Sequence, residues 1–491
     1  MACSDARTSR SRPCTWPNCW RNSMIEIRPQ IRSALSDSQL QKNLRVTLGK
    51  TAMARHQAIT EVANWEELRR HAHQVKAHTI SRLGEYLQQL EKNVIAQGGN
   101  VAWADTGREA LDYIFQLALK KDIRKVVKSK SMLGEEIRLN EELERNGIEP
   151  IETDLGEYIV QLGHEHPSHI VMPALHKSKE QVAALFVEKL GMPPTDDCEK
   201  ITATARRALR QHFLSARMGI TGVNFGVAET GTIVVVENEG NARLSVSVPE
   251  IHVAIMGLEK VIPRAADLSV FLKLLTRNAT AQKISTYVNL INGNRRRGEL
   301  DGPSEFHLVL VDNGRTRILA DEFLRQTLYC IRCGACLDVC PVYQTIGGHA
   351  YHSTYQGPIG AILTPQLLSV EEAPEHPFAS SLCGACYEIC PVKIEIPHIL
   401  LKLREKVQDQ KSARASRLPL ERWGLQVWSW IMTSPGRYAL TNRIARTLAR
   451  MFARKGRNPV PPLSAWTRSR ELPELAPKTF RELFEEEGRE S

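Results

Sequence analysis

The sequence lacks any apolar run approaching the roughly 18 residues that span a bilayer, and aliphatic runs such as Ile233–Val236 have only the length of a strand. The first 23 residues contain no apolar core of the kind that a secretory signal needs. Neither a complete G-x-G-x-x-G fingerprint nor a Walker A loop is present, so nothing in the sequence supports nucleotide binding. The 30 glycines and 25 prolines among 491 residues exclude a collagen-like or low-complexity chain.

Net positive charge is concentrated in one segment. Residues 401–460 hold fourteen basic and three acidic side chains, whereas residues 24–400 carry a net charge of −2. A nucleic-acid-binding domain spreads basic charge over its own face. We therefore expect no nucleic acid partner.

Cysteine is also sparse, at eleven residues, which is few for a disulfide scaffold of this length. Seven of the eleven fall in two tight groups between positions 330 and 390. Gaps of two and three residues are typical of metal or cluster ligands in a reducing compartment.

The length suggests about three domains, and the changes in composition divide the chain into four parts. Residues 1–54 form an N-terminal extension, 55–315 an α/β domain, 316–400 a cysteine-rich module, and 401–491 a helical tail that is basic and then Pro-rich. We interpret Met24 as the true start, with residues 1–23 not translated, and we assign no role to Cys3, Cys14 or Cys19.

Helical periods alternate with short aliphatic segments in the second part, which is the pattern of an α/β domain. We expect helices at 54–98, 106–120, 134–146, 179–190, 196–217 and 267–278, and strands at 125–127, 157–162, 232–237, 244–248, 252–257, 285–291 and 306–312.

The two cysteine groups are an internal repeat. Cys333–Val342 matches Cys383–Val392 at an offset of 50 residues, and the first copy completes C-x2-C-x2-C-x3-C-P from Cys330. This is the bacterial ferredoxin run for [4Fe–4S] clusters. Two-residue gaps let one tight loop deliver three thiolates to three corners of a cubane. Zinc also uses paired C-x-x-C, but it has no use for the third cysteine of the run.

In two-cluster proteins the fourth cysteine of a run ligates the other cluster. The spacing therefore predicts two crossed ligand sets: Cys330, Cys333, Cys336 and Cys390 for the first cluster, and Cys340, Cys383 and Cys386 for the second. The position that matches Cys330 is Ser380, so the second cluster lacks an obvious fourth thiolate. Its fourth corner is held by Ser380, by Cys198, by another ligand or by nothing, and a three-iron cluster is a further alternative.

Three weaker patterns accompany the repeat. His164, His166 and His169 resemble a metal tract, but no partner ligand is placed by the spacing, so we interpret the segment as a loop. Gly226–Thr232 is a turn before an aliphatic strand, and its backbone N–H groups can either cradle an anion or simply close the turn.

Four arginines in the tail recur at gaps of three and four, on one face of a predicted helix: Arg443, Arg446, Arg450 and Arg454. Leu440, Ile444, Leu448 and Met451 form the opposite stripe. Such a helix docks on an anionic membrane or an acidic partner, or presents a solvated face over a local core.

With these residues in view, the chain resembles the lactate utilization protein B family of bacterial L-lactate oxidation over about residues 50–485. The resemblance rests on Met218–Thr232, the two cysteine runs, Gly357–Gly360 between them, and Trp466–Pro473. It implies a LUD-type α/β domain similar to the sugar-isomerase and CoA-transferase fold. An α-helical, two-cluster ferredoxin-like module and a basic helical tail follow. Three cysteines at the second cluster fit the family's pattern.

The resemblance also implies a function. We expect a cytoplasmic, non-catalytic electron-transfer subunit with two [4Fe–4S] clusters, acting with lactate utilization proteins A and C in the oxidation of L-lactate to pyruvate. A peripheral membrane contact would run through the arginine stripe. The alternatives are an enzyme with acyl or CoA chemistry in its α/β domain, for which Glu229 is the candidate nucleophile, and a zinc-stabilised scaffold.

Overall fold

The computed structural model of the protein describes residues 25–414, 420–452, 476 and 478–490. The chain separates into two compact units, with the division between Gln408 and Asp409. Cys3, Cys14 and Cys19 lie outside the described residues.

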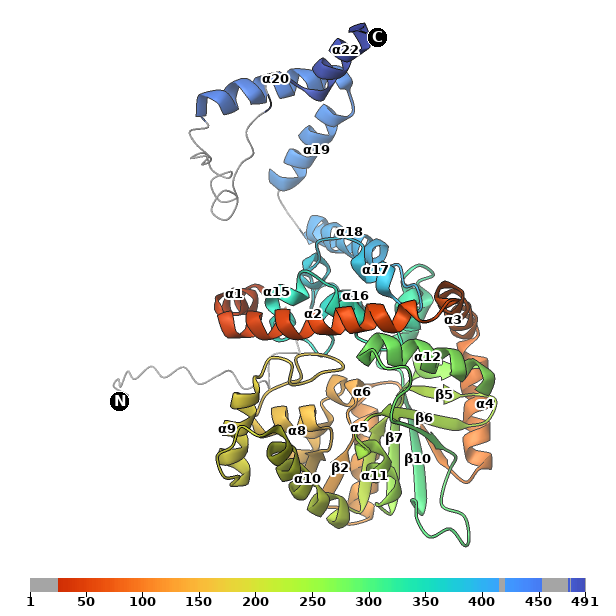
Figure 1. The fold of residues 1–491 in the computed structure, drawn as a ribbon. Coiled ribbons are helices and arrows are strands. Elements are labelled where there is room, and N and C mark those ends of the chain that lie inside the picture. The colour runs from red at the N-terminus through yellow and green to blue at the C-terminus, as the bar shows by residue number, and fades with distance from the viewer. Residues whose placement is uncertain (1–24, 415–419, 453–475, 477, 491) are drawn as a thin grey trace, which may run out of the picture. The chain divides into compact units, whose positions relative to one another are not determined.

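A six-stranded parallel sheet organises the first unit (Figure 1). Its strands, in spatial order, are β1 (Asn100–Ala104), β10 (Glu305–Val311), β7 (Ile251–Gly257), β4 (Met218–Gly222), β2 (Lys125–Lys128) and β3 (Glu149–Glu152). Every neighbouring pair is parallel. All seven residues of β7 are buried, as expected of a central strand with both faces covered. The α/β architecture predicted from the alternating pattern is thereby confirmed.

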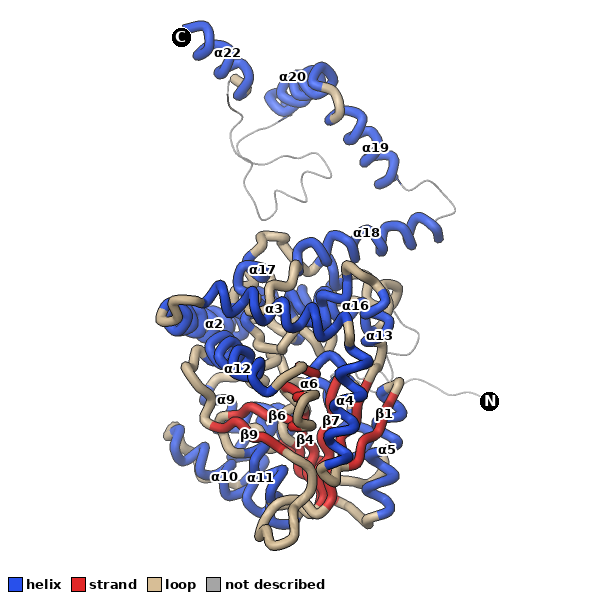
Figure 2. The backbone as a smooth tube through the Cα atoms, turned by 90° about the vertical axis from the view of Figure 1, so that its right-hand side faces the viewer, coloured by secondary structure: helices blue, strands red, loops and turns tan. Residues whose placement is uncertain are grey.

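Helices follow the strands along the chain: α5 (Gly107–Lys120), α6 (Met132–Glu136), α7 (Leu139–Arg145), α8 (Leu155–Leu162), α9 (Lys179–Leu190), α10 (Cys198–Ser215), α11 (Asn241–Ser247) and α12 (Ala265–Thr280). A second sheet has the order β8 (Val261–Ile262), β5 (Phe225–Val227), β6 (Thr232–Glu237) and β9 (Tyr287–Ile291). Figure 2 shows the strands of both sheets side by side, with helices around them.

The turn in Gly226–Thr232 joins β5 to β6 as an antiparallel pair. Gly231 has φ +69°, and a Cβ there would lie 2.7 Å from the backbone of Asn93. Asn93 donates to the carbonyl oxygens of Ala228 and Glu229 at 2.8 and 3.0 Å. The glycine is thus explained by close packing of the turn against a helix.

Two predicted strands are helices. Residues 157–162 lie in α8, where the Asp154 carboxylate accepts from the Glu157 N–H at 3.1 Å and caps the helix. Residues 244–248 overlap α11, whose first N–H groups, at Ala242 and Arg243, donate to the Glu237 carboxylate. Short apolar runs do not distinguish helix from strand, and in both cases a local cap decides the outcome.

The long helix predicted over 54–98 is divided into three. The described chain has α2 (Ser38–Thr60), α3 (Trp65–Ser81) and α4 (Leu83–Ala96), preceded by α1 (Arg28–Ser36). Helix α2 packs against α12 and against α14 (Ala335–Asp338) and α15 (Tyr343–Ile346). Leu44 and Leu48 on α2 are fully buried, so residues assigned to an N-terminal extension belong to the core of the first unit.

Short helices carry the cysteine-rich chain between α13 (Arg315–Ala320) and α18 (Ile396–Arg414). They are η2 (Leu324–Tyr329), α14, α15, η3 (His349–Tyr351), α16 (Gly357–Leu367), η4 (His376–Phe378) and α17 (Ala385–Ile389). Both Figures 1 and 2 place α2 along the boundary between these helices and the two sheets.

The second unit contains α19 (Leu420–Met432), α20 (Pro435–Phe452) and α22 (Phe480–Glu490). Among the helices of the described segments, none has the length and apolar character that crossing a bilayer requires.

Candidate metal centre

Four of the seven motif cysteines line one small cavity of about 20 Å³: Cys330, Cys333, Cys336 and Cys390. We refer to these four as the first cysteine group. The rest of the wall is largely aliphatic and includes Ile170, Ile359 and Ile394. Cys390 belongs to the second sequence motif, so this is the grouping that crossed ligation requires. The ligation itself stays a prediction.

Cys340, Cys383 and Cys386 form the second cysteine group. Burial, together with the neighbouring thiols of Cys340 and Cys383, raises the pKa of Cys386 to about 12. Burial and Cys383 likewise raise the pKa of Cys340. Cys336 on α14 and Cys386 on α17 belong to helices that pack against each other, so the two groups lie beside each other.

The described cysteines are all free thiols. In the first group, burial and the thiol of Cys330 raise the pKa of Cys390 to about 11. Such thiols stay protonated at neutral pH until a metal replaces the protons. Two sets of converging, unpaired thiols in an apolar setting are suited to soft metal centres such as iron–sulfur clusters.

The backbone repeats its shape in the two loops. Arg332, at φ +62°, donates its N–H to Cys330 Sγ at 3.4 Å. Leu382, at φ +57°, donates its N–H to Ser380 Oγ at 3.1 Å. A left-handed backbone at two non-glycine residues 50 positions apart is costly unless the surroundings impose it. Ser380 Oγ therefore occupies the place in the second loop that Cys330 Sγ has in the first.

Further N–H groups point at the sulfurs that end each motif. Tyr343 donates to Cys340 Sγ at 3.5 Å, and Ile394 donates to Cys390 Sγ at 3.3 Å. Hydrogen bonds of this kind stabilise thiolate and set the reduction potential of a cluster bound to it.

The two groups differ in exposure. Cys333, Cys340, Cys386 and Cys390 are buried, whereas Cys383 is exposed. Hydrogen bonds from the N–H of Ala385 and from Ser381 lower the pKa of Cys383. The second group thus has a solvent-facing edge.

Arg55, a buried cation with donors unpaired among the described residues, indicates whether an anionic cluster fits the first group. Arg55, on α2, is 5% exposed. Within the described part of the chain its Nε and Nη1 atoms are buried without a hydrogen-bond partner. Burial lowers the pKa of Arg55, whereas Asp338 and the thiols of Cys333 and Cys336 act to raise it. Buried donors are normally satisfied, and an anionic cluster held by Cys333 and Cys336 would supply the missing acceptor.

Arg69 fixes the end of the second loop. Its Nε and Nη2 donate to the carbonyl oxygen of Cys390 at 3.1 and 2.9 Å, and Nη2 also donates to that of Glu388 at 2.7 Å. Because Arg69 lies on α3, a helix distant in sequence positions the cysteine that joins the first group.

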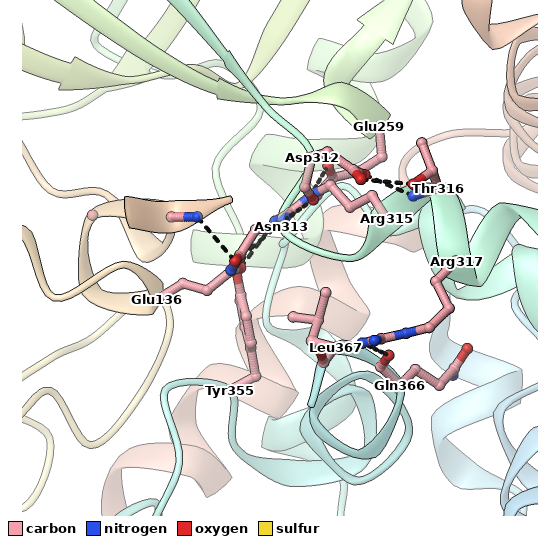
Figure 3. Close-up of polar contacts among 12 residues, drawn as sticks. Glu136, Glu259, Asp312, Asn313, Arg315, Thr316, Arg317, Tyr355, Gln366 and Leu367 are labelled. Carbon is pink, nitrogen blue, oxygen red and sulfur yellow. Dashed lines mark hydrogen bonds and ion pairs between the residues drawn. The ribbon is translucent and has the colours of Figure 1, made fainter. Parts of the chain in front are cut away.

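A buried ion-pair network joins the first cysteine loop to the carboxyl edge of the large sheet, and Figure 3 shows its part around Glu136, Glu259 and Arg315. Glu259, which follows β7, contacts Arg315 Nε at 2.5 Å and Arg332 Nη2 at 3.2 Å. Arg315 makes two further bonds of 2.9 Å to Glu136, which also accepts from the Tyr355 hydroxyl. Although burial opposes ionisation, Arg315 and Arg332 lower the pKa of Glu259 to about 2.

The predicted histidine tract is divided between different contacts. His169 Nδ1 accepts from the N–H groups of Val171 and Met172 at 3.0 and 3.1 Å. Its Nε2 therefore carries the proton and donates to Asp338 Oδ1 at 3.2 Å. Asp338 lies within the first cysteine motif, so the tract packs the α/β part against the cysteine loop.

Two other candidate residues also have defined places. The Glu229 carboxylate accepts from the Ala265 N–H at 2.9 Å, at the start of α12. Cys198 is exposed at the start of α10, and both Figures 1 and 2 place α10 at the opposite end of the first unit from α17. The structure does not bring Cys198 to the second group.

Only part of the arginine stripe lies within the described side chains. Arg443 on α20 is exposed, but Arg446 contacts Glu482 of α22 at 3.4 Å and donates to the carbonyl oxygen of Ala476 at 3.1 Å. Arg454 and the side chain of Arg450 lie outside the described residues. In the opposite stripe, Leu440 and Ile444 are 60% and 53% exposed, and the side chains of Leu448 and Met451 lie outside the described residues.

Three segments of the chain match known families. Residues 87–311 match the LUD domain, residues 326–394 match the 4Fe-4S dicluster domain, and residues 402–489 match the family described as Lactate utilisation protein B, C-terminal.

Two curated relatives are similar over most of the chain. Lactate utilization protein B of Shouchella clausii is 44% identical over 465 residues, which cover 94% of this chain and 97% of the relative. The protein of the same name from Anoxybacillus flavithermus is 46% identical over 441 residues, which cover 89% and 92%. A solved DUF162 family protein from Deinococcus radiodurans is 12% identical, covers 47% of this chain and 98% of that protein, and has a TM-score of 0.25.

Proposed function

Because this chain belongs to the lactate utilization protein B family, we propose that it carries electrons through two iron–sulfur clusters in the oxidation of L-lactate to pyruvate. The family gives a role in lactate utilization, and residues 326–394 supply an iron–sulfur domain. The observation that carries the proposal is the pair of adjacent thiol groups, one around a largely aliphatic cavity and one with a solvent-facing edge.

In this proposal the first cysteine group holds one [4Fe–4S] cluster and the second group holds the other, with Ser380 as its fourth ligand. The matching N–H bonds to Cys330 Sγ and Ser380 Oγ favour Ser380 over the alternatives. When bound, each cluster supplies a one-electron donor and acceptor.

The surrounding residues have distinct roles. The guanidinium groups of Arg55 and Arg332 offset the negative charge of a cluster at the first group. The aliphatic wall and the ion-pair network exclude water from it. Cys383 provides the edge at which a partner can approach closely enough for electron exchange.

The proposed partners are lactate utilization proteins A and C, and the proposed location is the cytoplasm, with a peripheral membrane contact through the tail. No flavin fingerprint is visible in the sequence. A two-electron acceptor that takes the hydride of lactate is accordingly assigned to a partner.

We further propose the sugar-isomerase and CoA-transferase fold for the α/β part. Ligands of such open sheets bind at the carboxyl ends of the strands. In the first unit, the network of Glu259, Arg315 and Arg332 covers the ends of β7 and β10. The carboxylate of Glu229, the candidate nucleophile, is occupied by the hydrogen bond from the Ala265 N–H at the start of α12. Both observations favour electron transfer over acyl or CoA chemistry. Turnover of an acyl-CoA by the isolated protein would favour the alternative.

Metal content is the first test. Protein purified without oxygen should carry about seven to eight iron atoms per chain if cubanes occupy both groups. It should be brown and show EPR signals after reduction. Cys333→Ser should lower the iron content by damaging the first cluster only. Stoichiometric zinc with negligible iron would contradict the proposal and favour a scaffold.

A further inference from the structure

Three carboxylates converge at the edge of the large sheet, away from the cysteines. Glu152 ends β3, Glu157 lies in the first turn of α8, and Glu135 lies on α6. One carboxylate oxygen from each lies within 4.8 Å of the others. We call these three residues the carboxylate trio.

The basic groups near the trio are Lys128 and, beside Glu135, His166. Lys128, which ends β2, is the register partner of Glu152 across the parallel pair. Its ammonium group is fully buried and contacts Glu152 at 2.7 Å and Glu135 at 3.4 Å. Three carboxylates against one ammonium leave two negative charges when all four groups are ionised.

The oxygens are also short of donors. Glu157 is 1% exposed, and within the described part of the chain neither of its carboxylate oxygens has a hydrogen-bond partner. The same holds for Oε2 of Glu152, which is 3% exposed, and for the buried Oδ1 of Asn140. Asn140 stands beside the trio, because its Nδ2 donates to Glu152 Oε1 at 2.6 Å.

Buried carboxylate oxygens without donors or cations are costly. Burial and the neighbouring Glu152 raise the pKa of Glu157 well above its ordinary value. Without a further cation, the ionised form of Glu157 is therefore disfavoured at this site. A converging set of oxygen atoms, with an uncompensated charge of two, is the environment that a hard divalent cation prefers.

We propose that the carboxylate trio binds one divalent cation of the Mg²⁺ and Mn²⁺ class. One such ion neutralises the charge that Lys128 leaves uncompensated. The side chain of Glu135 is 21% exposed, which gives the ion a path from solvent and leaves room for the water ligands that these ions retain.

The site is independent of electron transfer. It uses oxygen ligands on β3, α6 and α8, whereas the clusters of the proposed function use thiolates between residues 330 and 390. Thiolates select softer metals. Failure of the cation proposal would therefore not affect the electron-transfer proposal, and the reverse also holds.

The experiment uses full-length protein with both clusters loaded and oxidised, treated with EDTA and desalted. Mn²⁺ is added in steps, and the room-temperature EPR signal of free Mn²⁺ is recorded. We expect wild-type protein to remove one Mn²⁺ per chain from the free pool and Mg²⁺ to compete for it. Glu157→Gln preserves shape and removes one charged ligand. It should weaken Mn²⁺ binding roughly tenfold or more, as changes around bound metals do.

Glu144→Gln is the matched control, because Glu144 is an exposed carboxylate on the neighbouring helix α7. It should bind Mn²⁺ like wild type. The midpoint of thermal unfolding supplies a second readout: Mn²⁺ should raise it in wild type and in Glu144→Gln but not in Glu157→Gln. Absence of Mn²⁺ uptake by wild type, or equal uptake by Glu157→Gln, would overturn the proposal.

Discussion

Ser380 and Cys330 occupy equivalent positions in the two loops, yet one offers oxygen and the other sulfur. An alkoxide is a harder ligand than a thiolate and stabilises the oxidised iron more strongly. If Ser380 ligates the second cluster as proposed, this difference at a single residue should separate the reduction potentials of the two clusters.

Ser380→Cys tests that argument. The variant should keep its iron content and should raise the reduction potential of the second cluster, because a softer ligand replaces oxygen. Ser380→Ala should convert the second cluster to a three-iron form. EPR-monitored redox titration measures both effects, and Ser215→Ala, at the exposed serine that ends α10, is the control. An unchanged spectrum in both Ser380 variants would show that Ser380 is not a ligand.

Arg55 leads to a second residue-scale prediction. Its unpaired donors and its charge lie near Cys333 and Cys336, where they favour the more negative, reduced form of a cluster. Arg55→Gln should lower the reduction potential of the first cluster by an amount on the order of tens of millivolts. Arg45→Gln removes an exposed charge from the same helix and should leave the potential unchanged. If the first cluster has the same reduction potential in Arg55→Gln as in Arg45→Gln, Arg55 does not influence the cluster.

At the scale of the elements, α14 and α17 pack against each other, which is the contact that the predicted crossed ligation requires. Cys390→Ser should damage the cluster of the first group and so resemble Cys333→Ser in its iron content and EPR. Cys340→Ser should damage the other and resemble Cys386→Ser. The second loss should be larger, because two thiolates remain there rather than three. The opposite pairing would mean that each motif closes on its own cluster.

Local signals predicted many of the elements well. Thr106, whose side chain accepts from the Glu109 N–H at 3.2 Å, marks the start of α5 as its sequence suggests. The range 179–190 is α9, and 232–237 is β6. Where the prediction is wrong, at 157–162 and 244–248, the helix depends on a capping carboxylate that periodicity does not register.

Contacts between distant segments could not be predicted in the same way. The spacing predicts two cysteine ligand sets, and the structure places the four cysteines of the first set around one cavity. Nothing in the sequence indicates that Arg55 and Arg69, from helices that precede the sheet, lie at those cysteines. The trio was equally hidden, because Glu135, Glu152 and Glu157 meet only when β2 and β3 pair.

At the scale of the whole molecule, the second unit presents exposed aromatic side chains. Trp423, Trp428 and Trp430 on α19 are 62%, 57% and 59% exposed, and the exposed Arg443 lies on α20. Tryptophan with arginine is typical of helices that lie at a membrane interface. Arg446 is held by Glu482, so Arg443 is the better residue with which to probe lipid binding.

Co-sedimentation with vesicles provides the test. The full-length protein should bind vesicles containing phosphatidylglycerol at low salt, and binding should fall sharply at high salt because exposed charges are screened. Arg443→Glu should reduce binding several-fold while leaving cluster absorbance intact. Arg481→Glu makes the same charge change at an exposed position on α22 and should have a smaller effect. Trp428→Ala should weaken binding at both salt concentrations, because it removes apolar contact rather than charge. If wild-type protein binds neutral and anionic vesicles equally, or neither, the tail does not recognise anionic lipid, and its exposed tryptophans are then better explained by contact with another protein.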